Sequence, residues 1–172
     1  MELEQAIHGR RTHKVFAPEP VAPGVLQELF ELARWAPNHN LTNPWRFRVL
    51  GPRTLARLKV LAEELSPGSQ GKLDRAPTLV VASVLRTGEK AQQDDDLLAS
   101  AVAAYLVLLA AHGRGLAGYW RSVPLLDSPA ARKALAFDAA ERPIGLLHLG
   151  RPRQEQRVPE RAPVADFARY LP

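Results

Sequence analysis

The chain has 172 residues, of which 46% are hydrophobic, and it carries a formal net charge of +5. This length suits one domain with a substantial core, and the apolar share excludes a disordered chain. The absence of cysteine excludes disulfides, iron–sulfur clusters, thiolate zinc sites and thiol nucleophiles.

Helical and strand patterns alternate along the first 150 residues. Apolar residues at i, i+3, i+4 and i+7 mark the helices, as in the face formed by Leu26, Leu29 and Ala33. The apolar run from Leu79 to Leu85 is typical of a strand that is buried on both faces. The predicted elements are helices at 3–9, 23–36, 52–65, 97–112 and 129–137, and strands at 46–50, 79–85, 116–121 and 144–149.

Residues 151–172 differ from the rest of the chain, because they are rich in Arg and Pro and show little periodicity. Within this tail, Phe167, Tyr170 and Leu171 are apolar enough to dock on a surface, which an arm laid over a partner subunit would provide. No internal repeat and no second domain is evident. We predict a single domain, residues 1–172, in which residues 151–172 form a C-terminal arm.

No targeting or membrane segment is recognisable in the sequence. The first residues lack the basic and apolar regions of a signal peptide. The longest uncharged apolar run, residues 97–111, is shorter than a membrane span and suits a buried helix. Basic residues are dispersed and aromatics make up only 6%, so the stacking platform of a nucleic-acid binder is not evident. We therefore expect a cytoplasmic protein with no membrane partner and no nucleic-acid partner.

Residues 113–118 spell the glycine pattern G-x-G-x-x-G of dinucleotide-binding folds. That fingerprint needs a strand before it and a helix after it, so that the helix N-terminus faces the pyrophosphate. Here a predicted helix precedes the glycines and a predicted strand follows them. We therefore interpret Gly113 as a helix C-cap and not as part of a Rossmann fold.

Other apparent signals for chemistry are weak. Three aspartates, residues 94–96, precede the longest predicted helix, but no second acidic cluster completes a hard-cation site, so we interpret them as acids that offset the helix dipole. The five histidines show no metal-ligand spacing. Ser122 and Ser128 lack the G-x-S-x-G elbow of hydrolases. We predict no metal and no side-chain nucleophile.

Three polar segments remain as candidates for function. Residues 36–47 are too polar for a core and too rich in Asn, His and Pro for regular structure, which is typical of a ligand-binding loop. Residues 10–14 place three cations and a hydroxyl at a helix end, which suits a terminal phosphate, although a solvated helix cap is an equal alternative. Residues 118–122 end a strand with Trp120, a guanidinium and a hydroxyl, although alone Trp120 is more often a core residue. Together the segments suit a nucleotide-like ring cofactor with one phosphate.

The order and spacing of these motifs resemble the FMN-dependent nitroreductase family, and most closely its short NAD(P)H nitroreductases of the YdjA type. Where relatives usually carry Arg-Arg-Ser or Arg-x-Ser, this chain has Arg10-Arg11-Thr12. The resemblance implies an α+β fold with a mixed central sheet flanked by helices. It also implies an intertwined homodimer with two FMN sites at the subunit interface. The motifs that carry it are residues 10–12, 36–39, 43–47, 118–122 and 149–152.

The resemblance also implies roles for individual residues. Arg10, Arg11 and Thr12 are expected to hold the phosphate and the polar flavin edge. His39 and position 35 are expected to reach in from the other subunit; relatives often carry a basic residue at position 35, and here Trp35 either stacks on the cofactor or packs in the dimer. The expected FMN-binding set is Arg10, Arg11, Thr12, Lys14, Trp35, His39, Trp120, Arg121 and Ser122. The segment matching a region associated with NAD(P)H in relatives is Ala110, Ala111, His112, Gly113, Arg114 and Gly115.

The implied activity is a two-step electron transfer in which NADH or NADPH reduces FMN and a small oxidant, such as a nitroaromatic or a quinone, is then reduced. Because the cofactor carries the chemistry, no catalytic side chain is predicted, and Lys14 or an arginine near the ring supplies electrostatic stabilisation. One alternative is another flavin chemistry, such as ene reduction, dehalogenation or flavin breakdown. The other is a non-enzymatic basic dimer that binds nucleic acid or protein.

Overall fold

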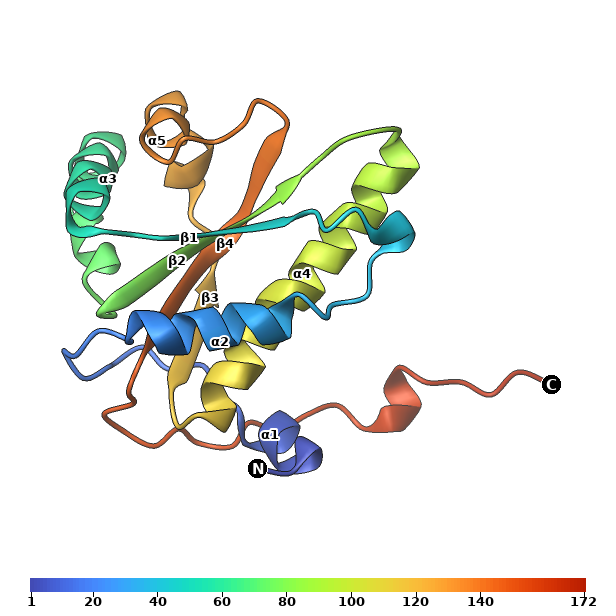
Figure 1. Ribbon diagram of the computed structural model, residues 1–172. Helices are drawn as coiled ribbons and strands as arrows, with labels where there is room; N and C mark the ends of the chain where they lie inside the picture. Colours follow the sequence, from blue (N-terminus) through green and yellow to red (C-terminus); the bar gives the residue numbers. More distant parts are fainter.

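The computed structural model describes all 172 residues and is built on one four-stranded sheet (Figure 1). All three strand pairs are antiparallel. The chain is therefore an α+β protein, as expected. The strands, in the spatial order β1-β2-β4-β3, are β1 (Trp45–Val49), β2 (Thr78–Leu85), β4 (Glu141–Gly150) and β3 (Ala117–Arg121).

In one respect the sheet differs from the mixed sheet that we expected. β2 and β3 run in the same direction and are joined through helix α4 (Lys90–Gly113), as in a parallel crossover. They are not neighbours, because β4 lies between them and pairs antiparallel with both. Parallel pairing is limited to an isolated bridge between Thr12 and Gly118, on the outer edge of β3.

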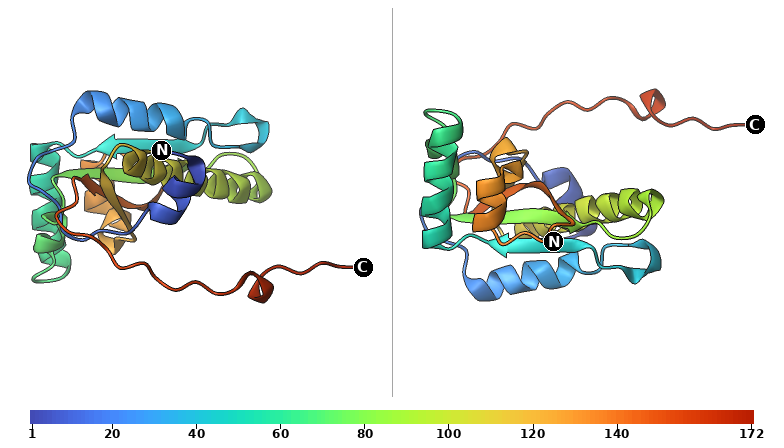
Figure 2. Two further views of the ribbon diagram at one scale, coloured as in Figure 1. Left: turned by 90° about the horizontal axis from the view of Figure 1, so that it is seen from below. Right: turned by 90° about the horizontal axis from the view of Figure 1, so that it is seen from above.

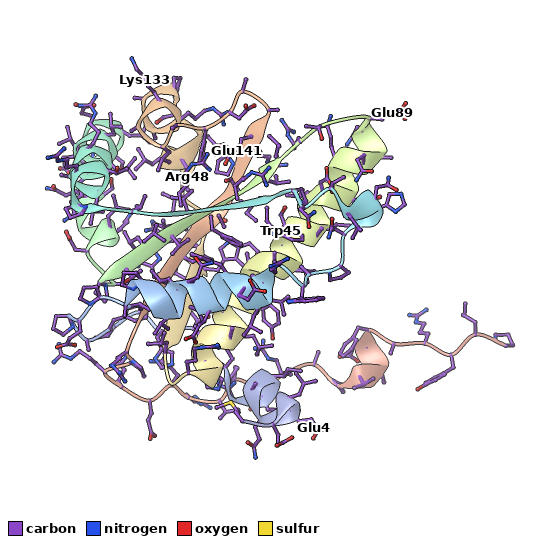
Figure 3. The ribbon with its side chains drawn as sticks, in the orientation of Figure 1. Glu4, Trp45, Arg48, Glu89, Lys133 and Glu141 are labelled. Carbon is purple, nitrogen blue, oxygen red and sulfur yellow. The ribbon has the colours of Figure 1, made fainter.

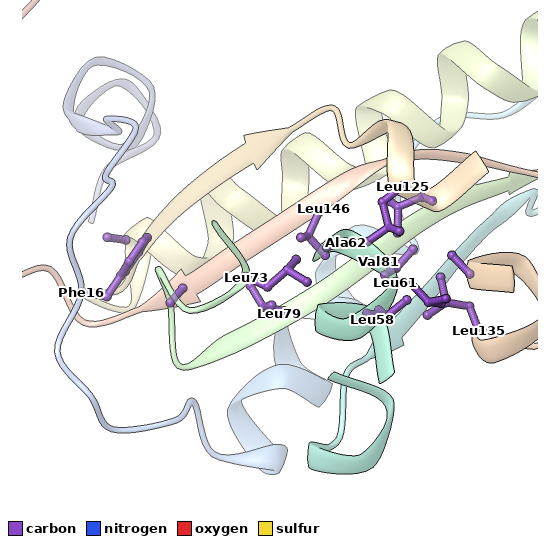
Figure 4. Close-up of a cluster of buried hydrophobic side chains, with 14 residues drawn as sticks. Phe16, Leu58, Leu61, Ala62, Leu73, Leu79, Val81, Leu125, Leu135 and Leu146 are labelled. Carbon is purple, nitrogen blue, oxygen red and sulfur yellow. The ribbon is translucent and has the colours of Figure 1, made fainter. Parts of the chain in front are cut away.

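Helices cover both faces of the sheet (Figures 1 and 2). Alternate residues of β2 serve the two layers, as its pattern predicted. Val80 and Ala82 belong to the cluster under α2 and α4, whereas Leu79 and Val81 belong to the cluster under α3 and α5 (Figure 4). The covering helices are α2 (Pro23–Ala33) and α4 on one face, and α3 (Pro52–Leu65) and α5 (Pro129–Ala134) on the other.

Helix α4 is long and apolar enough to cross a membrane, judged by length and composition alone. In the fold it packs against α2 and the sheet, and its Val107 and Ala111 are fully buried. The opposite side of the helix is open, because Leu98 is 67% exposed and Val102 is 40% exposed. The helix therefore has one face in the core and one apolar face without a partner in the single chain.

The start of α4 corrects our interpretation of the three aspartates. The helix begins at Lys90, so residues 94–96 lie in its second turn, and its first turn contains no acid. The Lys90 ammonium pairs with Asp94 at 2.9 Å. Asp96 is only 1% exposed and accepts a hydrogen bond from the Thr42 hydroxyl at 2.6 Å. Local pairing accounts for Asp94 and attachment of a loop accounts for Asp96, and neither residue lies in the first turn, where the helix dipole acts.

The end of α4 agrees with the sequence interpretation. The helix ends at Gly113, Gly115 adopts a positive φ of 72°, and β3 follows. A helix thus precedes the glycine pattern and a strand follows it, which is the reverse of the dinucleotide-binding arrangement.

A buried ion pair ties β1 to β4. Glu141 is 4% exposed and accepts hydrogen bonds from the Arg48 guanidinium and the Ser83 hydroxyl, and Arg48 and Glu141 point toward each other (Figure 3). Burial by itself would raise the pKa of Glu141. The hydrogen bonds from Arg48 and Ser83 outweigh it and hold that pKa below its ordinary value. This network has a structural role, and through the Ser83 hydroxyl it also reaches the Arg46 carbonyl at 3.4 Å.

The two ends of the chain lie outside the sheet layers. α1 (Leu3–Gly9) packs against α4, and residues 151–172 run away from the body as an extended arm (Figures 1 and 2). An isolated bridge between Phe16 and Pro152 marks where the arm departs. Near its end Tyr170 is fully exposed. We retain the single domain with a C-terminal arm as a proposal.

Candidate functional site

A basic cavity lies where α1 ends. Its volume is about 190 Å³, and no hydrophobic side chain lines it. Arg10 and Arg11 share it with Arg157 and Arg161 of the arm, and none of these four arginines forms an ion pair. The Nε atoms of Arg10 and Arg11 are buried without a hydrogen-bond partner. The cavity therefore gathers unsatisfied cationic donors that an anion of phosphate size would satisfy.

The next residues attach this cavity to the edge of the sheet. Thr12, which also lines the cavity, bridges Gly118, and the His13 N–H donates to the Gly118 carbonyl at 3.2 Å. β3 is an edge strand, and this bridge is the only pairing on its outer side. From Trp120 to Ser122 the outer backbone edge is therefore open to a ligand. That edge begins within two residues of the bridge, so the cavity and the edge can serve one elongated molecule.

The three residues at the end of β3 divide between the two faces of the sheet, as strand alternation predicts. Trp120 and Ser122 line a cavity of about 430 Å³ on the α4 side. Arg121 lines a separate cavity of about 180 Å³ on the α3 side. The structure thus brings the three predicted residues to one strand end but not into one cavity.

The indole of Trp120 is held in place by β4. Its Nε1 donates to the Ile144 carbonyl at 3.1 Å. The next residue, Gly145, has a φ of 154°, and a Cβ added there would overlap the indole and lie 3.0 Å from the Arg121 carbonyl. Only glycine allows this close approach of β4 to the Trp120 ring.

Three cations that line these cavities were not predicted from the sequence. Lys72, in the short turn Gln70–Leu73, lines the same cavity as Arg121, and neither residue forms an ion pair. Arg157 and Arg161 come from the arm. Their only signal was the high arginine content of the tail, and Lys72 lies in a loop without any motif, so the sequence could not connect them to Arg10.

Two histidines, His112 and His13, lie close to the arginines of the basic cavity without lining it. His112, in the last turn of α4, lies against Gly9, where an added Cβ would come within 2.8 Å of the His112 Nε2. Burial, and then the charges of Arg10 and Arg11, lower the pKa of His112. Burial and His112 lower the pKa of His13. Both side chains are therefore mainly neutral at pH 7, at the end of the molecule that already holds the unpaired arginines.

Trp35 and His39 lie near the opposite end of α4. Trp35 follows α2 and is 76% exposed, and His39 begins the turn His39–Leu41 with its side chain exposed. His39 lines an open cavity of about 450 Å³ together with Leu98 and Val102. Within one chain, the structure therefore does not bring these two residues to the basic cavity.

The remaining predicted residues do not form a common site. Lys14 is exposed beyond the Thr12 bridge. In the segment assigned to NAD(P)H, the side chain of Ala111 is fully buried, Arg114 pairs with Glu28 at 2.9 Å, and His112 faces Gly9. The assignment of residues 110–115 to NAD(P)H stays a prediction.

Comparison with known proteins identifies the same family that the sequence motifs resemble. The sequence profile of the nitroreductase family matches residues 7–151. The chain is 26% identical to the Escherichia coli protein YdjA, named as an NAD(P)H nitroreductase, over 96% of this chain and 98% of that protein. The crystal structure of a nitroreductase-like family protein from Bacillus cereus superposes with a TM-score of 0.89 at 23% identity, covering 99% and 96% of the two chains. The FMN- and NADPH-dependent nitroreductase NfnB from Sphigopyxis superposes with a TM-score of 0.85 at 14% identity, covering both chains completely. The chain therefore belongs to the nitroreductase family of oxidoreductases.

Proposed function

We propose that this protein is an FMN-dependent oxidoreductase that uses NADH or NADPH to reduce small acceptors such as nitroaromatics or quinones. The observation that carries the proposal is the basic cavity beside the open edge of β3, with two buried guanidinium Nε atoms that lack partners. The relatives support the choice of cofactor, since NfnB is described as FMN- and NADPH-dependent and YdjA is named for NAD(P)H. A small-molecule reaction of this kind suits a protein of the cytoplasm.

The donor set fits FMN. Arg10, Arg11 and Thr12 would bind its phosphate through charge-assisted hydrogen bonds, and Arg157 and Arg161 would add positive charge from the arm. A dianionic phosphate would satisfy the two buried Nε donors, which otherwise cost folding free energy. When bound, FMN supplies the transfer of hydride and electrons, which no side chain of this protein can provide.

The residues at the end of β3 would orient the ring system. The open backbone edge from Trp120 to Ser122 offers donors and acceptors to the polar flavin edge, and the Trp120 indole offers an apolar surface that excludes water. Lys72 and Arg121, both without ion-pair partners, would stabilise negative charge on the ring from the α3 side. Lys14 follows the bridge and would add a further cation beside the same edge.

We also propose that two copies share each site. Leu98, Val102, Tyr105 and Leu109 form a stripe at helical spacing on the side of α4 that does not face the sheet. An apolar stripe of this kind is expected to bury itself against a partner. The stripe would pack against the same stripe of a second copy in an isologous dimer.

The dimer would bring together the two ends of the site. His39 lies over Leu98 and Val102 toward the start of α4, whereas Arg10 stacks on the Tyr105 ring at 5.7 Å and borders His112 toward its end. A twofold axis near Val102, with the two α4 helices antiparallel, carries His39 and Trp35 of one copy to Arg10 of the other. This arrangement gives the exposed Trp35 and His39 a role in the partner's FMN site.

The test of the proposed function starts from the colour of the purified protein. We expect a yellow protein that releases FMN on denaturation and oxidises NADH or NADPH when a nitroaromatic or a quinone is supplied. Arg10→Ala is expected to weaken FMN binding at least about tenfold, because a charge-assisted hydrogen bond to the phosphate is lost. Arg57→Ala removes an exposed, unpaired arginine of α3 and is the matched control, with no expected effect.

Three results would contradict the proposal in different ways. A colourless protein that binds no added FMN would exclude the flavin site altogether. Colourless protein that instead binds nucleic acid with a steep dependence on salt would favour the basic binding dimer. FMN-loaded protein that turns over other substrates, but neither nitroaromatics nor quinones, would favour a different flavin chemistry on the same site.

A further inference from the structure

The loop that carries His39 has a strained backbone. Asn40, Leu41 and Asn43 have φ values of 54°, 50° and 46°; asparagine tolerates this left-handed region, but a leucine rarely adopts it. The strain does not serve burial, because the Leu41 side chain is 77% exposed and His39 is exposed. Strained backbone persists only where surrounding contacts hold it, and it concentrates at functional sites.

Contacts within the loop account for only part of its shape. The Asn43 N–H donates to the Asn38 side-chain oxygen at 2.9 Å, and the Asn43 amide donates to the Leu41 carbonyl at 2.7 Å. These bonds close the loop on itself. They do not fix its position relative to the rest of the molecule.

Two further hydrogen bonds attach the loop to α4. The Thr42 hydroxyl donates to Asp96 Oδ1 at 2.6 Å, and the Asn40 amide donates to Gln92 Oε1 at 3.0 Å. The two anchors are themselves connected, because the Gln92 amide donates to the same Asp96 oxygen at 3.0 Å. The loop is therefore attached to two consecutive turns of a rigid helix.

Asp96 differs from the neighbouring aspartates. It is 1% exposed, it forms no ion pair, and its Oδ2 has no hydrogen-bond partner, whereas Asp94 is exposed and pairs with Lys90. A buried carboxylate without a cation is costly to folding. Stability alone would favour an apolar residue at this position, so the carboxylate has to be explained by what it holds.

We propose that Asp96 is a positioning residue for the cofactor site. Through Thr42 it holds the strained loop so that His39 is presented to the FMN site of a second copy. The inference rests on the proposed function, and it adds a residue that never contacts the cofactor. It predicts that loosening the loop weakens FMN binding as strongly as truncating His39, although the basic cavity stays intact.

The decisive comparison is Thr42→Val against Thr42→Ser. Thr42 is exposed, so valine keeps the shape and removes only the hydroxyl, which reaches Asp96 at 2.6 Å and the His39 carbonyl more weakly at 3.4 Å, whereas serine keeps that hydroxyl. Titration of FMN fluorescence is expected to give a dissociation constant about tenfold higher for Thr42→Val. Thr42→Ser is expected to remain within about twofold of the unmodified protein, with both variants dimeric and folded.

A second comparison asks whether the effect passes through His39. In a His39→Ala background, Thr42→Val is expected to cause no further loss of FMN affinity, because the group that the loop positions is already absent. Asn40→Ala breaks the other attachment, at an exposed side chain, and is expected to act in the same direction. If Thr42→Val lowers the melting temperature, Asn40→Ala provides a second test of whether the attachment of the loop supports FMN binding.

The outcomes separate this inference from the proposed function. If the unmodified protein binds FMN and Thr42→Val binds it equally well, Asp96 has only a structural role. The inference is also wrong if Thr42→Val and His39→Ala act additively, or if Thr42→Ser loses as much affinity as Thr42→Val. If the unmodified protein binds no FMN, the proposed function fails, and the role of Asp96 fails with it.

Discussion

The two ends of α4 differ in the groups that they leave without a partner. Near its C-terminal end, unpaired guanidinium groups of Arg10 and Arg11 line a cavity without any hydrophobic side chain. Near its N-terminal end, the exposed Trp35 and the strained loop of His39 present side chains to solvent but have no charge surplus to satisfy. One end has unpaired cations without a hydrophobic lining, and the other has exposed side chains without surplus charge. In the dimer that we propose, the functional unit is larger than one chain, and α4 sets the distance between its halves.

The largest expected effect comes from separating the two copies. Val102→Arg places a guanidinium next to its own symmetry mate on the proposed twofold axis, where like charges would be desolvated together. We expect a monomer in sedimentation measurements and FMN binding weaker by roughly a hundredfold or more, because every basic cavity loses Trp35 and His39 of the partner copy together.

Val60→Arg provides the matched control for this variant. Val60 is 48% exposed on α3, so the same chemical change is made away from the α4 stripe. It is expected to leave the protein dimeric and loaded with FMN. A Val102→Arg protein that also stays dimeric and yellow would show that the axis does not pass near α4.

The next effect tests whether the two ends meet across the interface. Arg10→Ala and His39→Ala are each expected to bind FMN poorly as homodimers. In a mixture that exchanges subunits, about half of the dimers carry both variants, and one of their two sites is intact. Activity is therefore expected to recover to about a quarter of the unmodified level. If both residues instead belonged to one chain's site, mixing would restore nothing.

The sequence predicted this architecture unevenly. The apolar run of β2 and the helix–strand order around the glycine pattern were correct because local periodicity determines them. The place of β4 between β2 and β3 was not predictable, since pairing of distant strands leaves no local signal. The same limit applies to the start of α4, whose Asp96 takes its partner from Thr42, more than fifty residues away.

The site shows the same division. Residues 10–12 and 118–122 were predicted as parts of the site because each is a compact cluster of phosphate-binding or aromatic side chains. The alternation of Trp120 and Arg121 also followed from strand geometry. Arg157 and Lys72 were missed, because only the tertiary fold brings an isolated cation from the arm or from a loop to the site.

A smaller effect is expected from Gly145→Ala, which acts on the ring end of the site and leaves the arginines untouched. The added Cβ would overlap the Trp120 indole, so the ring must move and its hydrogen bond to the Ile144 carbonyl is lost. We expect a loss of about 1–3 kcal/mol in the free energy of unfolding and a changed tryptophan fluorescence spectrum. Gly24→Ala is the control, because a Cβ there meets no atom within 4 Å. If the environment of Trp120 is unchanged, the added Cβ displaces the backbone of β4 and not the indole.

The smallest effect is a pH dependence that belongs to only one end of α4. In the free protein, burial together with Arg10 and Arg11 holds the pKa of His112 low, so the ring is neutral at pH 7. A dianionic phosphate beside the arginines favours the protonated ring and raises that pKa, so binding takes up protons. FMN affinity is therefore expected to rise a few-fold as the pH falls from 8 to about 6.5, the ordinary histidine pKa. Below about pH 6 the gain is lost, as the phosphate itself takes up a proton.

His112→Gln is expected to flatten this dependence, and Thr42→Val is expected to lower affinity by the same factor at every pH. His13, whose pKa is lowered by burial and by His112, would keep a weaker dependence of the same sign. Titrations of FMN fluorescence at several pH values separate the two variants. If Thr42→Val changed the pH dependence of FMN affinity as much as His112→Gln does, this dependence would not belong to the His112 end of α4 alone. The phosphate would then have to lie nearer to the His39 loop than to the four arginines.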